Sequence, residues 1–121
     1  MNMVPSGPVK LHHIGLQQQE ITLLDSLCNA KPSLLEPFVF CGDPDPASPV
    51  DVLLLDADRP DAREQLQRCR RHAPRHLVLV TARDRQHRHY PTLKRPLSFA
   101  ALRDILAPLA TAPDPNQQAF G

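Results

Sequence analysis

The stretch from Val50 to Asp56 constrains the fold most, because four successive aliphatic residues in it precede an acid (VDVLLLD). A strand that is apolar at successive positions is buried on both faces, as in parallel sheets. His76 to Val80 (HLVLV) predicts a second strand of this kind. Between the two, Asp61 to Ala73 carries apolar residues at helical spacing, with arginines on its outer surface. Strands that alternate with helices in this way predict a parallel sheet and the α/β class.

The remaining segments extend the same alternation over one domain. Further strands are predicted at Lys10 to Leu16, Phe38 to Cys41 and Thr92 to Pro96, and further helices at Glu20 to Asn29 and after an N-cap at Ser98, with Pro108 limiting the last helix. A chain of 121 residues is long enough for a single core and too short for two. We expect an N-terminal arm at 1–9, one domain at 10–110 and a flexible tail or the start of a linker at 111–121.

Charge is unevenly distributed along the chain. Residues 59–95 contain 11 Lys or Arg against 3 Asp or Glu, whereas residues 1–58 contain 2 against 8. The second half is therefore expected to attract anions and the first half to be acidic.

The cysteines and the N-terminus indicate the compartment. Cys28, Cys41 and Cys69 are an odd number without the spacing of a zinc site, which favours a reduced, cytoplasmic protein. The N-terminal MNMVPSGPVK has no apolar signal-peptide core, and no apolar run approaches the length that spans a membrane. We expect a soluble, cytoplasmic protein with no membrane partner.

Short motifs at the predicted strand ends suggest a family. Asp56 ends an aliphatic strand and Pro60 follows four residues later; Thr81 ends the fourth strand; Lys94 and Arg95 precede a proline before the last helix. Over residues 8–110 this pattern resembles the receiver domain of bacterial response regulators. That resemblance implies a flavodoxin-like, doubly wound parallel sheet of five strands in the order 2-1-3-4-5. It also implies that Asp56 would be the phosphoacceptor, with Thr81 and Lys94 or Arg95 contacting the phosphoryl group.

The chain departs from the receiver pattern at the metal site. Transfer of a phosphoryl group to an aspartate needs Mg²⁺, which offsets the repulsion between two anions. Receivers supply a pair of acids after the first strand, and the matching positions here are Gln17 to Gln19. Asp56 and the weaker candidate Asp58 would remain as anionic ligands. We therefore expect weak Mg²⁺ affinity and no normal Mg²⁺-dependent phosphorylation, with a phosphorylatable regulator as the alternative.

A second departure concerns the helices. Only 13 residues separate Thr81 from Arg95, and prolines interrupt the segment between Cys41 and Val50. The second and fourth helices of the receiver plan are therefore expected to be absent or reduced to single turns. Aliphatic side chains of Val52 to Leu55 and Leu77 to Val80 would then lie near solvent. The gap would be filled by the loops Gly42 to Pro49 and Ala82 to Pro91 or, as we favour, by a second copy in a homodimer.

Other residues suggest ligand binding. In the basic 83–95 loop, Arg83, Arg85 and Arg88 are candidate anion ligands for a nucleotide or nucleic acid, with Tyr90 available for stacking. The arginine pairs 59/63 and 71/75 resemble an element that binds cyclic dinucleotides. A weaker metal site would combine His87 and His89 with His72 or His76.

No nucleophile elbow and no glycine-rich phosphate loop is present, so conventional catalysis is not expected. The sequence favours a degenerate receiver-like domain that acts in bacterial signalling through contacts with a partner protein. A nucleotide-binding or nucleic-acid-binding module is the other alternative.

Overall fold

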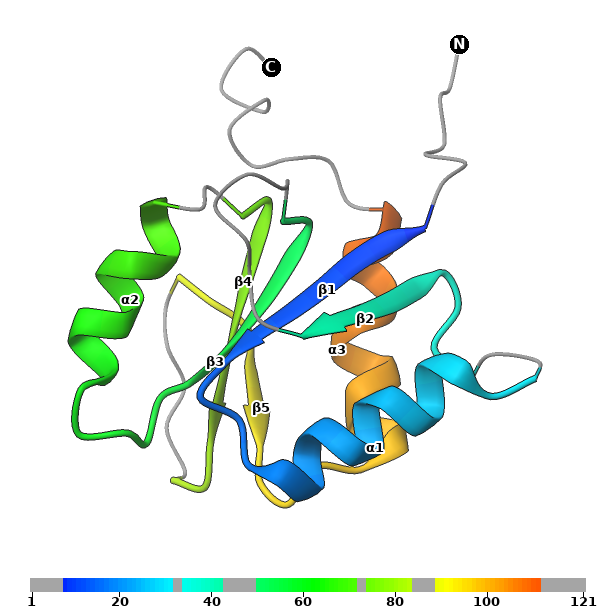
Figure 1. Ribbon diagram of the computed structural model, residues 1–121, viewed down its shortest axis with the longest axis horizontal. Coiled ribbons are helices and arrows are strands. Elements are labelled where there is room, and N and C mark those ends of the chain that lie inside the picture. Colours follow the sequence, from blue (N-terminus) through cyan, green and yellow to red (C-terminus); the bar gives the residue numbers. More distant parts are fainter. Residues whose placement is uncertain (1–7, 32–33, 43–49, 72–73, 84–88, 112–121) are drawn as a thin grey trace, which may run out of the picture.

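The fold is a single parallel sheet with helices on both faces (Figure 1). The structure, a computed structural model, describes residues 8–31, 34–42, 50–71, 74–83 and 89–111. The strands are β1 (Val9–Ile14), β2 (Phe38–Gly42), β3 (Val52–Asp56), β4 (His76–Thr81) and β5 (Thr92–Lys94). They lie in the order β2-β1-β3-β4-β5 and every neighbouring pair is parallel. The predicted α/β fold and strand order are confirmed.

Three helices cover the sheet in the part of the chain that the structure describes. Helices α1 (Gln18–Asn29) and α3 (Phe99–Thr111) pack on one face, and α2 (Ala62–Arg71) packs on the other (Figure 1). Within the described residues no helix joins β2 to β3 or β4 to β5, although 43–49 and 84–88 lie outside them. The expected loss of two receiver helices is thus confirmed within these limits.

Alternation along the central strands builds two separate cores. Val52 and Leu54 of β3 pack with Leu102 and Leu106 of α3 on the larger side. Leu53 of β3, which points the opposite way, belongs to the smaller core beneath α2. Because β3 contributes to both cores, every one of its residues is buried, as its aliphatic composition predicts.

The β3 and β4 aliphatics do not lie near solvent, and of the two coverings expected for them, the structure shows the chain's own loop, through Tyr90 of the 82–91 segment. Leu53 is 0% exposed and Leu79 is 9% exposed in the single chain. Partly buried side chains pack against this smaller core, among them Leu66 of α2 and Tyr90. Among the described residues, β3 and β4 are the only strands that contribute buried aliphatic side chains to this smaller core. One helix and the Tyr90 side chain are therefore enough to cover it. Over β3 and β4, this face therefore offers no exposed aliphatic patch for a second copy to cover.

Both faces of β1 are covered, so His12 and His13, whose side chains point to opposite faces of the sheet, are only 4% and 7% exposed. The His13 ring stacks on Phe40 with centroids 5.5 Å apart. Pro108 does not end the last helix, since α3 continues to Thr111. Leu109, just beyond that proline, packs against the larger core, which favours continued helix over a break.

Candidate functional site

Four segments bring polar side chains together at the carboxyl edge of the sheet. Asp56 ends β3, Thr81 ends β4 and Arg95 follows β5. The first turn of α1, which follows β1, contributes Glu20. Carboxyl ends of parallel strands meet at one edge, which is where ligands of open α/β sheets bind.

Arg95 is the centre of this group. Its Nε donates to Glu20 Oε2 at 2.7 Å and its Nη2 to Glu20 Oε1 at 2.9 Å, a bidentate pair. Its Nη1 donates to Asp56 Oδ1 at 2.9 Å and to Asp58 Oδ2 at 3.1 Å. The Arg95 side chain is only 10% exposed. One buried guanidinium thus binds three carboxylates, which we call the Arg95 cluster (Glu20, Asp56, Asp58 and Arg95).

Asp58 has further donors. The Thr81 hydroxyl donates to Asp58 Oδ1, and the Ala82 N–H donates to Oδ2 at 2.7 Å. Partial burial would raise the pKa of Asp58, but the hydrogen bonds from Thr81, Ala82 and Arg95 outweigh it and lower the pKa below its ordinary value. Asp58 is therefore held as a carboxylate that links β3, β4 and Arg95.

Arg95 is held equally firmly in its charged form. Hydrogen bonds to Glu20 raise the pKa of Arg95, against the opposing effect of burial, and the bond to Asp56 raises it further. Asp56 Oδ1 also accepts from the Asp58 N–H at 2.9 Å. The proposed phosphoacceptor therefore uses one oxygen for both a guanidinium and a loop amide.

Glu20 is the member of this cluster that sequence reasoning missed. The expectation counted only Asp56 and Asp58 as anions, because Gln17 to Gln19 occupy the positions of the acid pair. Those three glutamines are exposed, whereas Glu20 is 5% exposed. The signal was a capping pattern: Glu20 lies three residues after Gln17, and its Oε1 accepts from the Gln17 N–H at 2.9 Å. That contact turns the Glu20 carboxylate towards the sheet edge.

Mg²⁺ does not fit this arrangement. Arg95 contacts both oxygens of Glu20 and one oxygen each of Asp56 and Asp58, so the guanidinium stands where a shared cation would need to lie. Among the described residues, no three His, Cys, Asp or Glu side chains are grouped so that they could hold a metal ion. His72 and His87 of the weaker metal candidate lie outside the described residues.

Two of the other predicted basic residues, Lys94 and Arg83, neighbour Arg95 and Ala82 in the sequence and have exposed side chains. Lys94 is exposed at the end of β5, and Arg83 is exposed beyond β4, where its N–H donates to Thr81 Oγ1 at 3.0 Å. Arg85 and Arg88 lie outside the described residues, so the three-arginine anion site stays a prediction.

The two arginine pairs are not brought together into one site. Arg59 pairs with Asp61 at 2.9 Å near the carboxyl edge, whereas Arg63 and Arg71 are exposed on α2. Arg75 lies at the opposite edge of the sheet, before β4.

A cavity of about 470 Å³ adjoins the Arg95 cluster, between α1 and the segment that leads into α3. Its walls are largely apolar, with the Glu20–Arg95 pair at one side. The residues around it are Gln17, Gln19, Glu20, Leu23, Ala82, Arg95, Pro96 and Leu97.

No protein-family model, curated protein or solved structure matches this chain. Across the described residues, no helix has the length and apolar composition needed to cross a membrane.

Proposed function

We propose that this chain is a degenerate receiver-like domain that acts in cytoplasmic bacterial signalling through protein contacts, without Mg²⁺-dependent phosphorylation. The observation that carries the proposal is the Arg95 cluster, in which one guanidinium binds the carboxylates of Glu20, Asp56 and Asp58. In the receiver plan, this is where a cation assists phosphotransfer to aspartate.

The charge of the cluster supports this reading. Three carboxylates face one guanidinium, so the group keeps an excess of negative charge before any phosphoryl group approaches. A phosphoryl group carries further negative charge, and its transfer depends on cations that neutralise it. Arg95 cannot turn to serve an incoming phosphoryl group without leaving Glu20, a buried carboxylate, unpaired. The cluster is thus suited to a fixed conformation rather than to a phosphorylation switch.

The contact surface that best supports a partner lies at the edge strand β2. Val39 is 45% exposed, and Leu34 before the strand is 50% exposed; these are the large hydrophobic residues with marked exposure in the described part of the chain. Phe38 and Phe40 belong to the larger core, so Val39 points to the other face, where a receiver would have its second helix. A second copy or a signalling partner would bury this edge.

Phosphorylation is tested by incubating the protein with acetyl phosphate and Mg²⁺ and measuring its intact mass, with Asp56→Ala as the control. We expect no added mass in either protein. A phosphoryl adduct that disappears in Asp56→Ala would overturn the proposal and establish the alternative of a working response regulator.

The partner surface is tested by sedimentation at tens of micromolar. We expect a dimer that Val39→Asp dissociates, whereas Thr22→Asp, at an exposed position on α1, leaves it intact. If the wild-type protein sediments only as a monomer, the prediction of a homodimer is wrong, and the partner would be a different protein.

A further inference from the structure

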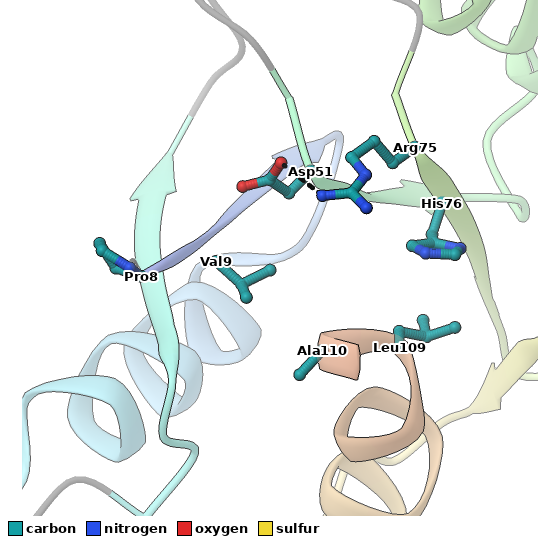
Figure 2. A pocket seen from close by; sticks show the side chains of 7 residues that line it. All are labelled: Pro8, Val9, Asp51, Arg75, His76, Leu109 and Ala110. Atoms are coloured by element: carbon teal, nitrogen blue, oxygen red, sulfur yellow. Dashed lines mark ion pairs between the residues drawn. The ribbon is translucent and has the colours of Figure 1, made fainter. Parts of the chain in front are cut away.

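A second cavity, of about 200 Å³, lies at the amino edge of the sheet, opposite the Arg95 cluster (Figure 2). It is bounded by the starts of β1 and β4, by the residue before β3 and by the last turn of α3. Its lining residues are Pro8, Val9, Asp51, Arg75, His76, Leu109 and Ala110. Two of these side chains, Asp51 and Arg75, carry opposite charges and three, Val9, Leu109 and Ala110, are aliphatic.

The charged groups of Asp51 and Arg75 lie side by side but form no direct hydrogen bond with each other. Arg75 Nη1 is 3.9 Å from Asp51 Oδ1, beyond hydrogen-bond distance. Asp51 Oδ2 accepts from the Lys10 N–H at 2.8 Å, which fixes the carboxylate, while Oδ1 remains turned towards Arg75. The side chains of Arg75 and Asp51 are 38% and 25% exposed, so a ligand can reach both. In Figure 2, the guanidinium of Arg75 faces Asp51 across the top of the cavity.

The lower wall of the cavity is apolar. Val9 belongs to the larger core, and Leu109 and Ala110 pack against that core from α3. Figure 2 places these side chains below the charged pair, with the His76 ring between Arg75 and Leu109. A ligand with two adjacent charges at one end and a small aliphatic group at the other would complement this lining.

We propose that this cavity binds a small aliphatic α-amino acid as its zwitterion. The ammonium group would donate to Asp51 Oδ1 and the carboxylate would accept from Arg75, so that each ligand charge meets its opposite. The ammonium and carboxylate of an α-amino acid are separated by one carbon, which matches two protein charges 3.9 Å apart. The aliphatic side chain would lie against Val9, Leu109 and Ala110.

The size of the cavity supports this ligand class. At about 30 Å³ for each water-sized group, 200 Å³ holds roughly seven non-hydrogen atoms, close to the size of valine. Cofactors and drug-sized ligands occupy larger pockets, about 300–1,000 Å³. The site shares no residue with the Arg95 cluster, so its test and the phosphorylation test are independent.

The experiment is titration of the full chain with L-valine, followed by calorimetry and by the thermal midpoint. Isobutyrate, which lacks the ammonium group, and isobutylamine, which lacks the carboxylate, are the matched ligands. We expect saturable binding of L-valine, a rise of the thermal midpoint with its concentration, and at least tenfold weaker binding of either matched ligand. The proposal that the cavity binds a zwitterion would be wrong if isobutyrate saturated the protein at the same concentration as valine. It would also be wrong if valine showed no saturable binding up to about 10 mM.

Substitutions at the two charged lining residues test whether the ligand binds in this cavity. Arg75→Gln and Asp51→Asn should each weaken valine binding at least tenfold, and Arg63→Gln, at an exposed position on α2, should leave it unchanged. Asn retains an oxygen that can accept from the Lys10 N–H; if Asp51→Asn nevertheless fails to fold, Arg75→Gln alone decides, because Arg75 is partly exposed. Equal affinities for wild type and Arg75→Gln would refute the site.

Discussion

Replacing Arg95 by methionine is the most informative perturbation of this protein. Methionine keeps an unbranched side chain and removes the charge, leaving Glu20 and Asp56 buried without their cation. Their side chains are 6% and 9% exposed, so water can solvate them poorly. Removal of one partner from a buried ion pair costs about 3–5 kcal/mol. For a domain of this size, we expect the thermal midpoint to fall by roughly 10–30 °C.

The matched control is Arg103→Met. Arg103 lies 4.0 Å from Asp104, and these side chains are 59% and 73% exposed. Such exposed pairs contribute about 0–1 kcal/mol, so the control should unfold at nearly the wild-type urea concentration. Urea titration followed by circular dichroism measures both variants. A loss in Arg95→Met no larger than that in Arg103→Met would refute the claim that Arg95 stabilises the fold by pairing with the buried carboxylates.

Mg²⁺ should offset part of the loss in Arg95→Met, because Glu20, Asp56 and Asp58 are then left without the cation that pairs with them. Mg²⁺ should stabilise the variant by about 1.4 kcal/mol at ten times its dissociation constant and leave wild type unchanged. If Arg95→Met does not fold, the addition of Glu20→Gln removes one of the stranded charges and permits the same comparison.

Three further predictions concern the fold and its pH dependence. Gly15 and Gly42 have φ of +82° and +80°, so alanine at either should cost about 1–2 kcal/mol of backbone strain in urea melts, and an unchanged urea midpoint would contradict the left-handed backbone at that glycine. The lowered pKa of Asp58 adds stability that is present above its ordinary value of 3.8 and is lost as the pH falls through the lowered value. Below about pH 4, the thermal midpoint of Asp58→Asn should therefore fall less steeply with pH than that of wild type. Equally steep falls in the two proteins would contradict this prediction. Leu53→Ala, at a position that is 0% exposed, should cost about 2–5 kcal/mol in urea melts, and a loss under 1 kcal/mol would mean that the smaller core is loosely packed.

The strands and helices could be predicted because their signals are local. Val52 to Leu55 is apolar at every position, which indicates a strand with two buried faces, and His76 to Val80 repeats the pattern. The order of the strands required more than these patterns and came from the resemblance carried by Asp56 and Pro60. The absence of a helix between β2 and β3 among the described residues agrees with the three prolines of that segment, which disfavour regular helix, whereas the single Pro108 is accommodated inside α3.

The Arg95 cluster could not be predicted in the same way. Glu20 and Arg95 are 75 residues apart, and neither carries a local signal for the other. Sequence reasoning considered Arg95 as a ligand for a phosphoryl group and Glu20 only as part of a helix. Their bidentate pair exists because β1 and β5 end at the same edge of the sheet, with α1 turning back over that edge.

The coverage of the sheet illustrates the same difference. Only 13 residues lie between Thr81 and Arg95, and no helix occurs among those of them that the structure describes, but this length could not reveal that α2 and Tyr90 would cover Leu53 and Leu79. Composition and periodicity indicate which side chains are buried, because the hydrophobic effect favours the burial of an apolar side chain whatever its position in the chain. Which side chains cover them, and which charge neutralises which, depends on distances between segments remote in sequence, and those distances arise only when the sheet assembles.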